Sequence, residues 1–216
     1  MSGIILTMDY RPALTLLWKA TRGAAACLLA VALFALGFYA WLHSDGNVCE
    51  VLPGRLYRAA QPSELGLADL SRKHGIKTIV NLRGEHPGEP WYDREKAFAE
   101  RNGLRLVSLS LSAGRVLSVE EMRGLEKVFA SSAGPVLVHC KSGSDRTGLA
   151  CAIYLLLDGA SWAAADGQLS LRFGHFPYLW SVSQAMDDSF AHYGRLRGLS
   201  GERRPGDGLV GALAGE

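Results

Sequence analysis

The sequence predicts an α/β fold, in which a central, mainly parallel sheet is flanked by helices and preceded by one transmembrane helix. Three observations support this prediction. From about residue 52 to residue 193, short apolar stretches alternate with stretches of helical periodicity, which is typical of a parallel sheet covered on both faces. At residues 135–157 an apolar strand leads through a short loop into an apolar helix. An uncharged segment precedes this whole region.

The uncharged segment, residues 23–42, predicts a transmembrane helix, because about twenty apolar residues cross a bilayer in helical form. Tyr39 and Trp41 lie at one end, where aromatic belts occur. A cleaved signal peptide and a core helix are the alternatives. The segment is longer than the roughly 7–15 apolar residues of a signal peptide. It also lacks the polar face that a core helix would have.

The charges beside this segment predict its orientation. Three basic residues precede it: Arg11, Lys19 and Arg22. Residues 43–50 contain no Lys or Arg. By the positive-inside rule, residues 1–22 are cytoplasmic and the main domain lies outside the cytoplasm, in the periplasm if the source is bacterial. We expect a linker at residues 43–51 and a disordered, Gly- and Arg-rich tail at residues 194–216.

Helix caps and periodicity place the elements of the main domain, residues 52–193. The first helix is expected at residues 63–74, with Ser63 as N-cap and Gly75 at its end, and a buried strand at residues 76–82. The later elements are a helix at 91–102 closed by Gly103, a strand at 104–111, a helix at 118–131 with a capping box of Ser118 and Glu121, and helical stretches at 161–172 and 178–193.

The loop between the apolar strand and the apolar helix contains the sequence His-Cys-Lys-Ser-Gly-Ser-Asp-Arg-Thr-Gly, residues 139–148. Amide N–H groups of a loop that enters a helix N-terminus form an anion-binding cup. Cys140 lies at the base of this cup, and thiolates at helix N-termini have pKa values lowered from about 8.5 to roughly 3.5–7.5. Arg146 can bind two oxygens of one phosphate. Gly143 allows the turn, and the Thr147 hydroxyl can donate to the thiolate.

This loop resembles the Cys-x5-Arg signature of the cysteine-based protein-tyrosine-phosphatase superfamily, in its dual-specificity branch. Residues 56–62 and 78–83 are similar to the opening strands of small bacterial and plant-type members, and the resemblance covers roughly residues 52–193. It implies hydrolysis of phosphate monoesters through a cysteinyl-phosphate intermediate, without a metal or a cofactor. The expected site comprises the catalytic residues Cys140, Arg146 and Asp145, the phosphate-binding residues Lys141, Ser142, Gly143, Ser144 and Arg146, and the supporting residues His139 and Thr147.

The general acid is the least obvious of these roles. In the family an Asp on a mobile loop protonates the leaving oxygen, but the matching segment here, residues 106–117, contains no carboxylate. Some lipid phosphatases and bacterial tyrosine phosphatases of the superfamily carry an Asp at the loop position of Asp145. To act as an acid, Asp145 has to be protonated, which a partly desolvated pocket favours. Alternatively it pairs with a nearby Arg and braces the loop. Further candidates are Glu85, Glu89 and Asp93.

Other chemistries fit the loop less well. A buried core cysteine followed by an ordinary helix would not need the glycine and the Arg-Thr pair, and the loop of a rhodanese-type sulfurtransferase is usually shorter. The formal charge of +2 is too small to indicate nucleic-acid binding, and no metal-spaced Cys/His cluster is visible. The histidines are scattered, and we expect three of them on the surface or in turns rather than as ligands: His86, His175 and His192.

The expected partner is a phosphorylated protein or a lipid headgroup. About ten residues separate the apolar segment from the domain and span at most roughly 35 Å, so the site would stay close to the bilayer. Lys141 beside the nucleophile suits a multiply charged headgroup. We therefore expect a phosphatase of the tyrosine or dual-specificity type with a membrane-lipid phosphate as physiological substrate. The alternative is a catalytically weak, phosphate-binding membrane module.

Overall fold

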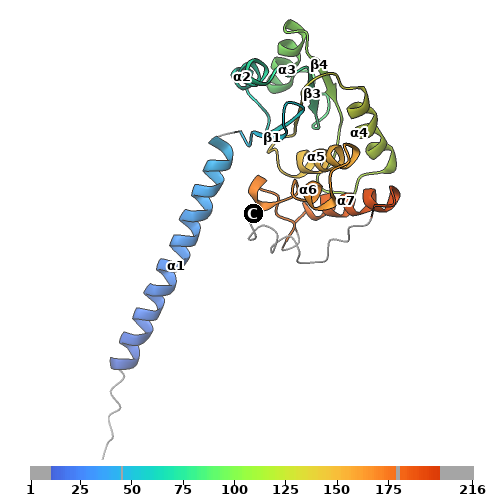
Figure 1. The fold of residues 1–216 in the computed structure, drawn as a ribbon. Helices are drawn as coiled ribbons and strands as arrows, with labels where there is room; N and C mark the ends of the chain where they lie inside the picture. Colours follow the sequence, from blue (N-terminus) through green and yellow to red (C-terminus); the bar gives the residue numbers. More distant parts are fainter. Residues whose placement is uncertain (1–10, 45, 179–180, 200–216) are drawn as a thin grey trace, which may run out of the picture. The chain divides into compact units, whose positions relative to one another are not determined.

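The computed structural model describes residues 11–44, 46–178 and 181–199. The chain divides into two compact units, residues 1–41 and 42–216, which are described one at a time. The first unit consists of helix α1, Arg11–Ser44 (Figure 1). Within α1, Trp18–Phe38 has a mean hydropathy of 1.8 and exposed side chains.

Among the described residues, α1 is the one helix that is long and apolar enough to cross a bilayer. A signal sequence has the same properties near an N-terminus. The apolar stretch begins at Trp18, five residues before the predicted segment 23–42. The side chains of Tyr39 and Trp41, expected at the membrane surface, lie outside the described residues.

The second unit is an α/β domain with a five-stranded sheet of order β1-β2-β5-β3-β4 (Figure 1). Its strands are β1 (Cys49–Leu52), β2 (Leu56–Ala59), β3 (Thr78–Asn81), β4 (Arg105–Ser108) and β5 (Val136–His139). Only the β1–β2 pair is antiparallel. The predicted fold class, a mainly parallel sheet, is confirmed. Strand β1 begins at Cys49, within the segment assigned to the linker.

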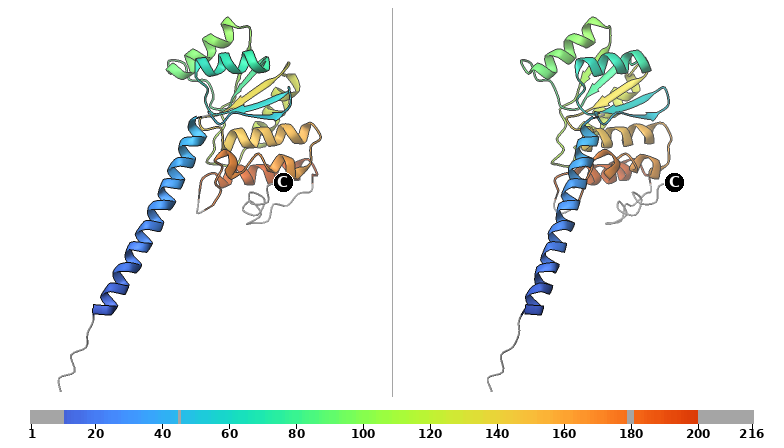
Figure 2. Two further views of the ribbon diagram at one scale, coloured as in Figure 1. Left: turned by 60° about the vertical axis from the view of Figure 1, so that its left-hand side comes forward. Right: turned by 90° about the vertical axis from the view of Figure 1, so that its left-hand side faces the viewer.

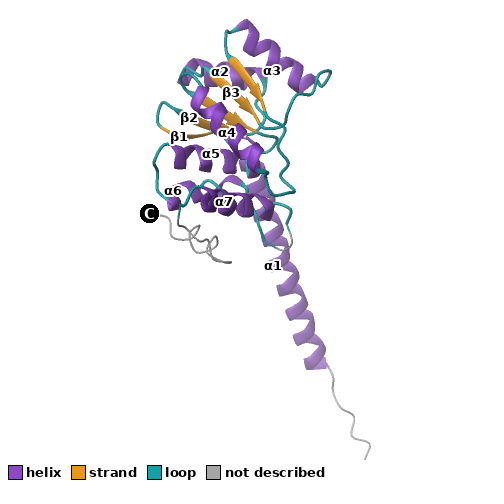
Figure 3. Cartoon of the chain, turned by 90° about the vertical axis from the view of Figure 1, so that its right-hand side faces the viewer, coloured by secondary structure: helices purple, strands orange, loops and turns teal. Residues whose placement is uncertain are grey.

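Helices cover both faces of the sheet, as Figures 2 and 3 show. They are α2 (Glu64–His74), α3 (Pro90–Arg101), α4 (Val119–Ser131), α5 (Asp145–Leu157), α6 (Trp162–Asp166) and α7 (Gln184–Leu196), with the short 3-10 helix η1 (Leu171–Phe173). Alternate residues of β5 enter two cores. Leu137 packs towards α2 and α3, whereas Val136 and Val138 pack towards α4, α5 and α7. This alternation places the end of β5 in the middle of the domain.

The helix caps agree with the predictions from the sequence. The Ser63 hydroxyl accepts from the amide of Gly66 at the start of α2, and Gly75 ends this helix with a φ of 64°. The predicted capping box of α4 is present, since Ser118 and Glu121 exchange both hydrogen bonds. These local predictions are confirmed because a cap needs only residues within one turn.

Two predicted helices differ from the structure. The stretch 161–172 is broken into α6 and η1, and the break turns the main-chain carbonyl of Gln168 towards the Arg58 guanidinium at 2.9 Å. Of the stretch 178–193, residues 179–180 lie outside the described residues. After them the helix begins only at Gln184, because the Ser181 hydroxyl accepts the amide of Ser183 in a local turn. Helix α7 continues to Leu196, into the predicted tail, of which residues 200–216 lie outside the described residues.

Candidate active site

Cys140 follows the last residue of the central strand β5 and is 1% exposed. The amide N–H of Gly143 donates to its Sγ atom over 3.3 Å. Helix α5 begins at Asp145, so the loop passes from the strand end to the helix N-terminus within five residues. The structure thus places the predicted nucleophile at the base of this loop, with the Gly143 amide facing the sulfur.

The carbonyl groups of this loop are held by residues outside it. The Lys141 carbonyl accepts from the amide of Gln61, and the Ser142 carbonyl accepts from the Asn47 side chain. The carbonyls of Gly143 and Ser144 accept from Arg58 Nη2, at 2.7 and 3.4 Å. When successive carbonyls are turned outwards, the amide N–H groups between them are free to face inwards. The loop therefore has the backbone arrangement of an anion-binding cup.

Gly143 is the residue that this backbone path requires. Its φ is +75°, which side chains with a Cβ rarely adopt. A Cβ at this position would also lie 2.6 Å from the amide nitrogen of Ala60 and 2.7 Å from the Ala59 carbonyl oxygen. The loop packs directly against the end of β2, and only glycine fits between them.

Arg146, in the first turn of α5, is held by the backbone at the ends of β3 and β4. Its Nη1 donates to the carbonyls of Leu82 and Leu111, at 3.3 and 3.2 Å. Its Nε is buried and has no hydrogen-bond partner among the described residues. A buried N–H donor without a partner is costly. A phosphate oxygen would accept a hydrogen bond from this N–H, so an anion is the expected ligand of the Arg146 side chain.

Arg58 lies beneath the loop and is 0% exposed. Besides the two loop carbonyls, it donates to Gln168 and covers the Phe173 ring at 3.6 Å from the centroid. No carboxylate is among these contacts, and burial lowers the pKa of this guanidinium. Within the part of the chain that the structure describes, Arg58 therefore lies under the loop without a carboxylate partner.

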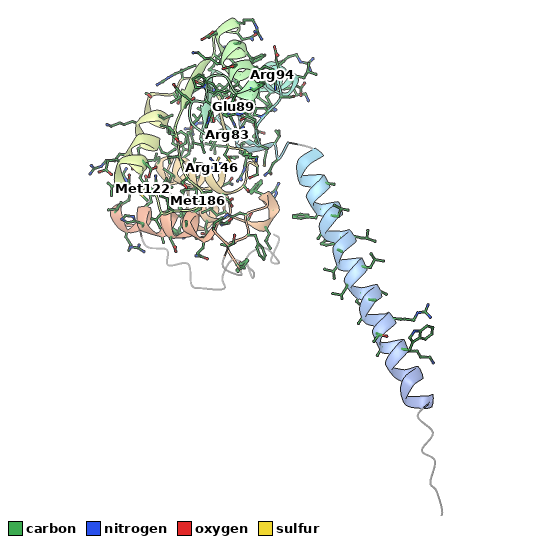
Figure 4. All side chains as sticks on the ribbon, turned by 180° about the vertical axis from the view of Figure 1, so that it is seen from behind. Arg83, Glu89, Arg94, Met122, Arg146 and Met186 are labelled. Carbon is green, nitrogen blue, oxygen red and sulfur yellow. The ribbon has the colours of Figure 1, made fainter. Side chains whose placement is uncertain are left out.

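A second arginine lies beside Arg146. Burial and the charge of Arg146 lower the pKa of Arg83, which stacks on Trp91 at 3.4 Å from the ring centroid. Figure 4 shows Arg83 between Arg146 and Glu89. Arg83 Nη1 donates to the Gln61 side chain, which also lines a neighbouring cavity of about 250 Å³ with Trp91 and Arg94. Arg83 and Arg94 therefore bring two cationic side chains to this side of the loop, where Glu64 and Glu95 also line the cavity.

Asp145 is paired with a histidine rather than with the arginine that the sequence suggested. His175 Nδ1 lies 2.7 Å from Asp145 Oδ1, and His175 Nε2 lies 2.9 Å from Asp187 Oδ2. His175 is 0% exposed, so the expectation that it lies on the surface is wrong. His86, by contrast, is exposed as expected, and His192 is half-buried.

The other acid candidates lie in or beside the loop before α3. Asp93 accepts two hydrogen bonds from the amide of Gly88 and so closes this loop. Glu85 and Glu89 are exposed, and Glu89 is the N-cap residue of α3. Glu89 acts electrostatically on Arg83. Within the described residues, none of these three carboxylates makes a hydrogen bond to the phosphate loop, residues 140–146.

The supporting residues occupy distinct places. The His139 ring is fully buried, with Nε2 2.7 Å from Glu95 Oε1 but not aligned as a hydrogen bond. The Thr147 hydroxyl is buried without a partner among the described residues. Ser142 and Ser144 share a hydrogen bond of 2.7 Å between their hydroxyls. Lys141 is exposed at the rim.

Sequence reasoning missed Arg58, Arg83, His175 and Asp187. Arg58 and Arg83 belong to the strand motifs that carried the resemblance, and an arginine within an apolar strand was the available signal. No spacing rule connects His175 or Asp187 to the loop, because they come from different elements. Across the described residues, no group of three or more His, Cys, Asp or Glu side chains is arranged to hold a metal ion.

Comparison with known proteins places this site in context. The model of the PTP-NADK family, DSP-PTPase phosphatase fused to NAD+ kinase, matches residues 38–175. The dual specificity protein phosphatase TpbA of Pseudomonas aeruginosa is 36% identical over 103 residues, which are 47% of this chain and 43% of TpbA. A beta-lactamase hydrolase-like protein of Xylella fastidiosa is 34% identical over 107 residues, 49% of this chain and 24% of that protein. The matches thus span less than half of these curated relatives.

Solved structures agree with the fold. The crystal structure of P. aeruginosa TpbA has a TM-score of 0.55 and 28% identity, and the match covers 71% of this chain and 91% of that one. TpbA has also been solved in complex with pTyr. The catalytic domain of the PP-IP phosphatase SIW14 from S. cerevisiae has a TM-score of 0.52 and 21% identity, covering 70% and 93% of the two chains. The last likeness concerns the fold alone.

Proposed function

The chain belongs to the PTP-NADK family of DSP-PTPase phosphatases, and on this premise we propose that it hydrolyses phosphate monoesters through a cysteinyl-phosphate intermediate. One observation supports the proposal above all. The carbonyls of residues 141–144 accept hydrogen bonds from outside the loop, the amide of Gly143 donates to Cys140 Sγ, and the buried Nε of Arg146 has no partner among the described residues. We infer that these groups form one binding position for a phosphate. Binding alone would not need a thiol at the base of this position.

In the first step, the thiolate of Cys140 attacks phosphorus. The S–P bond forms while the bond from phosphorus to the leaving oxygen breaks, and the leaving oxygen takes a proton from Asp145. Arg146 and the loop amides hold the phosphoryl oxygens in the transition state, where their charge is largest. The Thr147 hydroxyl, which has no partner among the described residues, would turn its hydrogen to the sulfur in this step and ease the later departure of the thiolate.

In the second step, water attacks the phosphorus of the cysteinyl phosphate. Its proton passes to the carboxylate of Asp145, the S–P bond breaks, and phosphate leaves with the Cys140 thiolate restored. The same carboxyl group therefore acts first as acid and then as base. No cofactor takes part in either step.

Hydrolysis of p-nitrophenyl phosphate by the full chain in detergent tests the nucleophile. Cys140→Ser should abolish turnover and retain phosphate binding, because the cup and Arg146 remain. Cys49→Ser is the matched control, since Cys49 lies half-buried on the edge strand β1. If Cys140→Ser keeps the activity of the unchanged chain, the mechanism is wrong. If the unchanged chain binds phosphate without hydrolysing it, the phosphate-binding module is the better description.

For the substrate, we propose the phosphate of a membrane-lipid headgroup. Lys141 adds an exposed positive charge directly after Cys140. An apolar helix immediately before the domain would keep the site near a bilayer, where lipid phosphates have a high effective concentration. The complex of TpbA with pTyr favours the other substrate class, a phosphotyrosine protein.

A comparison of kcat/KM on a short-chain phospholipid phosphate and on a phosphotyrosine peptide separates the two classes. Lys141→Ala should lower the value for the lipid more than for the peptide. Lys127→Ala, which removes an exposed lysine on α4, should change neither. A strong preference for the peptide that Lys141→Ala leaves unchanged would exclude the lipid proposal.

We also propose that α1 is a single-pass anchor with residues 1–22 in the cytoplasm and the catalytic domain outside it. The basic residues before the apolar stretch and their absence from residues 43–50 support this orientation. Labelling of a cysteine introduced at the exposed position Ser112 with a membrane-impermeant maleimide tests it in intact bacterial cells. Labelling only after cell lysis would show that the catalytic domain lies in the cytoplasm, opposite to the proposed orientation. Release of the domain by cleavage would indicate a signal sequence.

A further inference from the structure

The segment after η1 carries a histidine that the proposed mechanism does not use. His175 is 0% exposed, and both of its ring nitrogens face carboxylate oxygens. Nδ1 lies 2.7 Å from Asp145 Oδ1, and Nε2 lies 2.9 Å from Asp187 Oδ2. The three side chains come from the N-terminus of α5, from the segment between η1 and α7, and from the first turn of α7. Their two contacts connect helix α7 to the phosphate loop through side chains.

The hydrogen-bonding rules for these three side chains determine which of their atoms carry hydrogens. An ionised carboxylate only accepts hydrogen bonds, so Oδ1 of Asp145 is satisfied when His175 Nδ1 carries the ring hydrogen. Asp187 is nearly buried and fixes the ring from the far side, with a side chain 5% exposed. The Asp145 side chain is 22% exposed and therefore reaches the solvent side of the site.

The two carboxyl oxygens of Asp145 differ in their hydrogen bonding. Oδ1 accepts the N–H of His175, whereas Oδ2 has no hydrogen bond within the described part of the chain. A proton carried by Asp145 then sits on Oδ2, since Oδ1 already faces a hydrogen. The N–H of His175 also stabilises the carboxylate that remains once this proton has been given away.

We propose that His175, fixed by Asp187, is a positioning residue for the general acid: it holds Asp145 through Oδ1 so that Oδ2 delivers the proton to the leaving oxygen. This inference rests on the proposed function, because it assigns partners to the acid of that mechanism. No proton passes between the three side chains. The proton leaves Oδ2 in the first step and returns to Oδ2 from water in the second, while His175 keeps the hydrogen on Nδ1.

Leaving-group dependence distinguishes positioning from a merely structural role. Full chains carrying His175→Ala, His175→Gln and Asp187→Asn are compared on an alkyl phosphate, which needs protonation of its leaving oxygen, and on p-nitrophenyl phosphate, which needs little. His175→Ala should lower kcat on the alkyl phosphate by about 10²-fold, the lower range for loss of a general acid. The loss on p-nitrophenyl phosphate should be much smaller. Asp188→Asn, a change of the exposed neighbour of Asp187, should leave both rates unchanged.

Two further measurements make the result decisive. His175→Gln keeps one N–H donor and should restore part of the rate on the alkyl phosphate. In a chain that already carries Asp145→Asn, His175→Ala should cost nothing more on this substrate, because the acid that it positions is absent. Equal losses on both substrates, or losses that add in the double variant, would overturn the inference.

Failure of the proposed function gives a different pattern. In that case the unchanged chain and Cys140→Ser hydrolyse p-nitrophenyl phosphate equally or not at all, and the inference falls with the mechanism. Melting temperatures of all variants are measured alongside. If His175→Ala unfolds the domain, the comparison rests on His175→Gln and Asp187→Asn, which retain hydrogen-bonding groups, and equal losses on the two substrates overturn the inference there as well.

Discussion

The phosphate loop and the acid end of the site are assembled in different ways. The loop, residues 140–146, is one contiguous stretch that connects a buried strand to a buried helix. The acid end joins Asp145 to His175, 30 residues further along the chain, and His175 to Asp187, 12 residues further again. Loop chemistry is therefore visible in local spacing, whereas the surroundings of the acid exist only in the folded domain.

The two regions also depend on different structural features, the loop on its backbone and the acid end on its side chains. The loop depends on one special backbone angle and on outside donors for its carbonyls, so it should tolerate no added side chain. The acid end depends on side chains that can be replaced with the backbone left in place. Substitutions in the loop should therefore act on every substrate, and those at the acid end on some substrates only.

The largest expected effect is that of Gly143→Ala. The φ of +75° disfavours alanine, and the new Cβ would lie 2.6 Å from the backbone nitrogen of Ala60, which cannot move away as a flexible side chain could. We expect loss of hydrolysis on aryl and alkyl phosphates together. Steady-state rates and phosphate binding by calorimetry measure it.

Gly103→Ala is the matched control for this change. Gly103 also has a positive φ, of +63°, but nothing lies within 4 Å of its Cβ position. Gly103→Ala should cost about 1–2 kcal/mol of stability, the penalty for a left-handed residue with a side chain. Activity of Gly143→Ala at the level of Gly103→Ala would show that the loop is less tightly fitted than the distances indicate.

Asp145→Asn should have the next largest effect, and a selective one. The amide cannot give up a proton as a carboxylic acid does, so kcat on an alkyl phosphate should fall by about 10²–10⁴-fold. The rate on an aryl phosphate, whose leaving oxygen needs little protonation, should fall much less. Rates on a series of phosphates with leaving groups of increasing pKa provide the measurement. Equal losses along the series would mean that Asp145 only braces the loop.

The fold was largely predictable because its signals are local. The caps Ser63, Gly75 and Ser118 act within one helical turn, and the buried strands are apolar enough to be recognised by composition. The stretch 161–172 was predicted wrongly because its break at Gln168 serves a distant residue, Arg58. Local propensity contains no information about such a partner.

The proposed site was predictable only where its signals are local. The roles proposed for Cys140, Gly143 and Arg146 follow from a strand, a turn and a helix start in succession, and the structure joins Gly143 to Cys140 by a hydrogen bond. The partners that orient the loop and its acid, Arg58 and His175, were not assigned roles. Arg58 reaches the loop through strand pairing of β2 with β5, and His175 through its side-chain contact with Asp145 at the start of α5. Neither relation has a fixed spacing in the sequence.

Substitution of Arg58 tests how far the loop depends on support from elsewhere in the fold, because Arg58 contacts the loop from another strand. Arg58→Met removes the charge and the donors to the carbonyls of Gly143 and Ser144, whereas Arg58→Lys keeps the charge. Loss of hydrogen bonds from a charged donor costs about 1.5–3 kcal/mol, or roughly 10- to 150-fold in phosphate affinity if the loop depends on it. Inhibition by inorganic phosphate measures this loss. Recovery in Arg58→Lys would assign the effect to charge, and no recovery would assign it to the two carbonyl contacts.

The smallest expected effect on activity concerns Cys151, the second buried cysteine of the strand–loop–helix unit. Burial raises the pKa of its thiol to about 12, against about 8.5 in an unfolded chain. Between these values the unfolded chain loses a proton that the folded chain keeps, so the free energy of unfolding falls as the pH rises, by at most about 1.4 kcal/mol per unit. Cys151→Ala should reduce this decline between pH 8.5 and 10 and leave hydrolysis at pH 7 nearly unchanged.

Urea unfolding of the catalytic domain within the full chain, followed by tryptophan fluorescence at several pH values, measures the decline. Burial also raises the pKa of Tyr193, and an ordinary tyrosine has a pKa of about 10, so Tyr193 adds to the decline near the upper end of the window. This contribution is the same in Cys151→Ala and in the unchanged chain, so the difference between them reports on Cys151. Cys49→Ala should retain the decline, because Cys49 is only half-buried. An identical decline in Cys151→Ala and the unchanged chain would contradict the assignment. A loss of hydrolysis in Cys151→Ala would mean that the helix behind the loop is as intolerant of change as the loop itself.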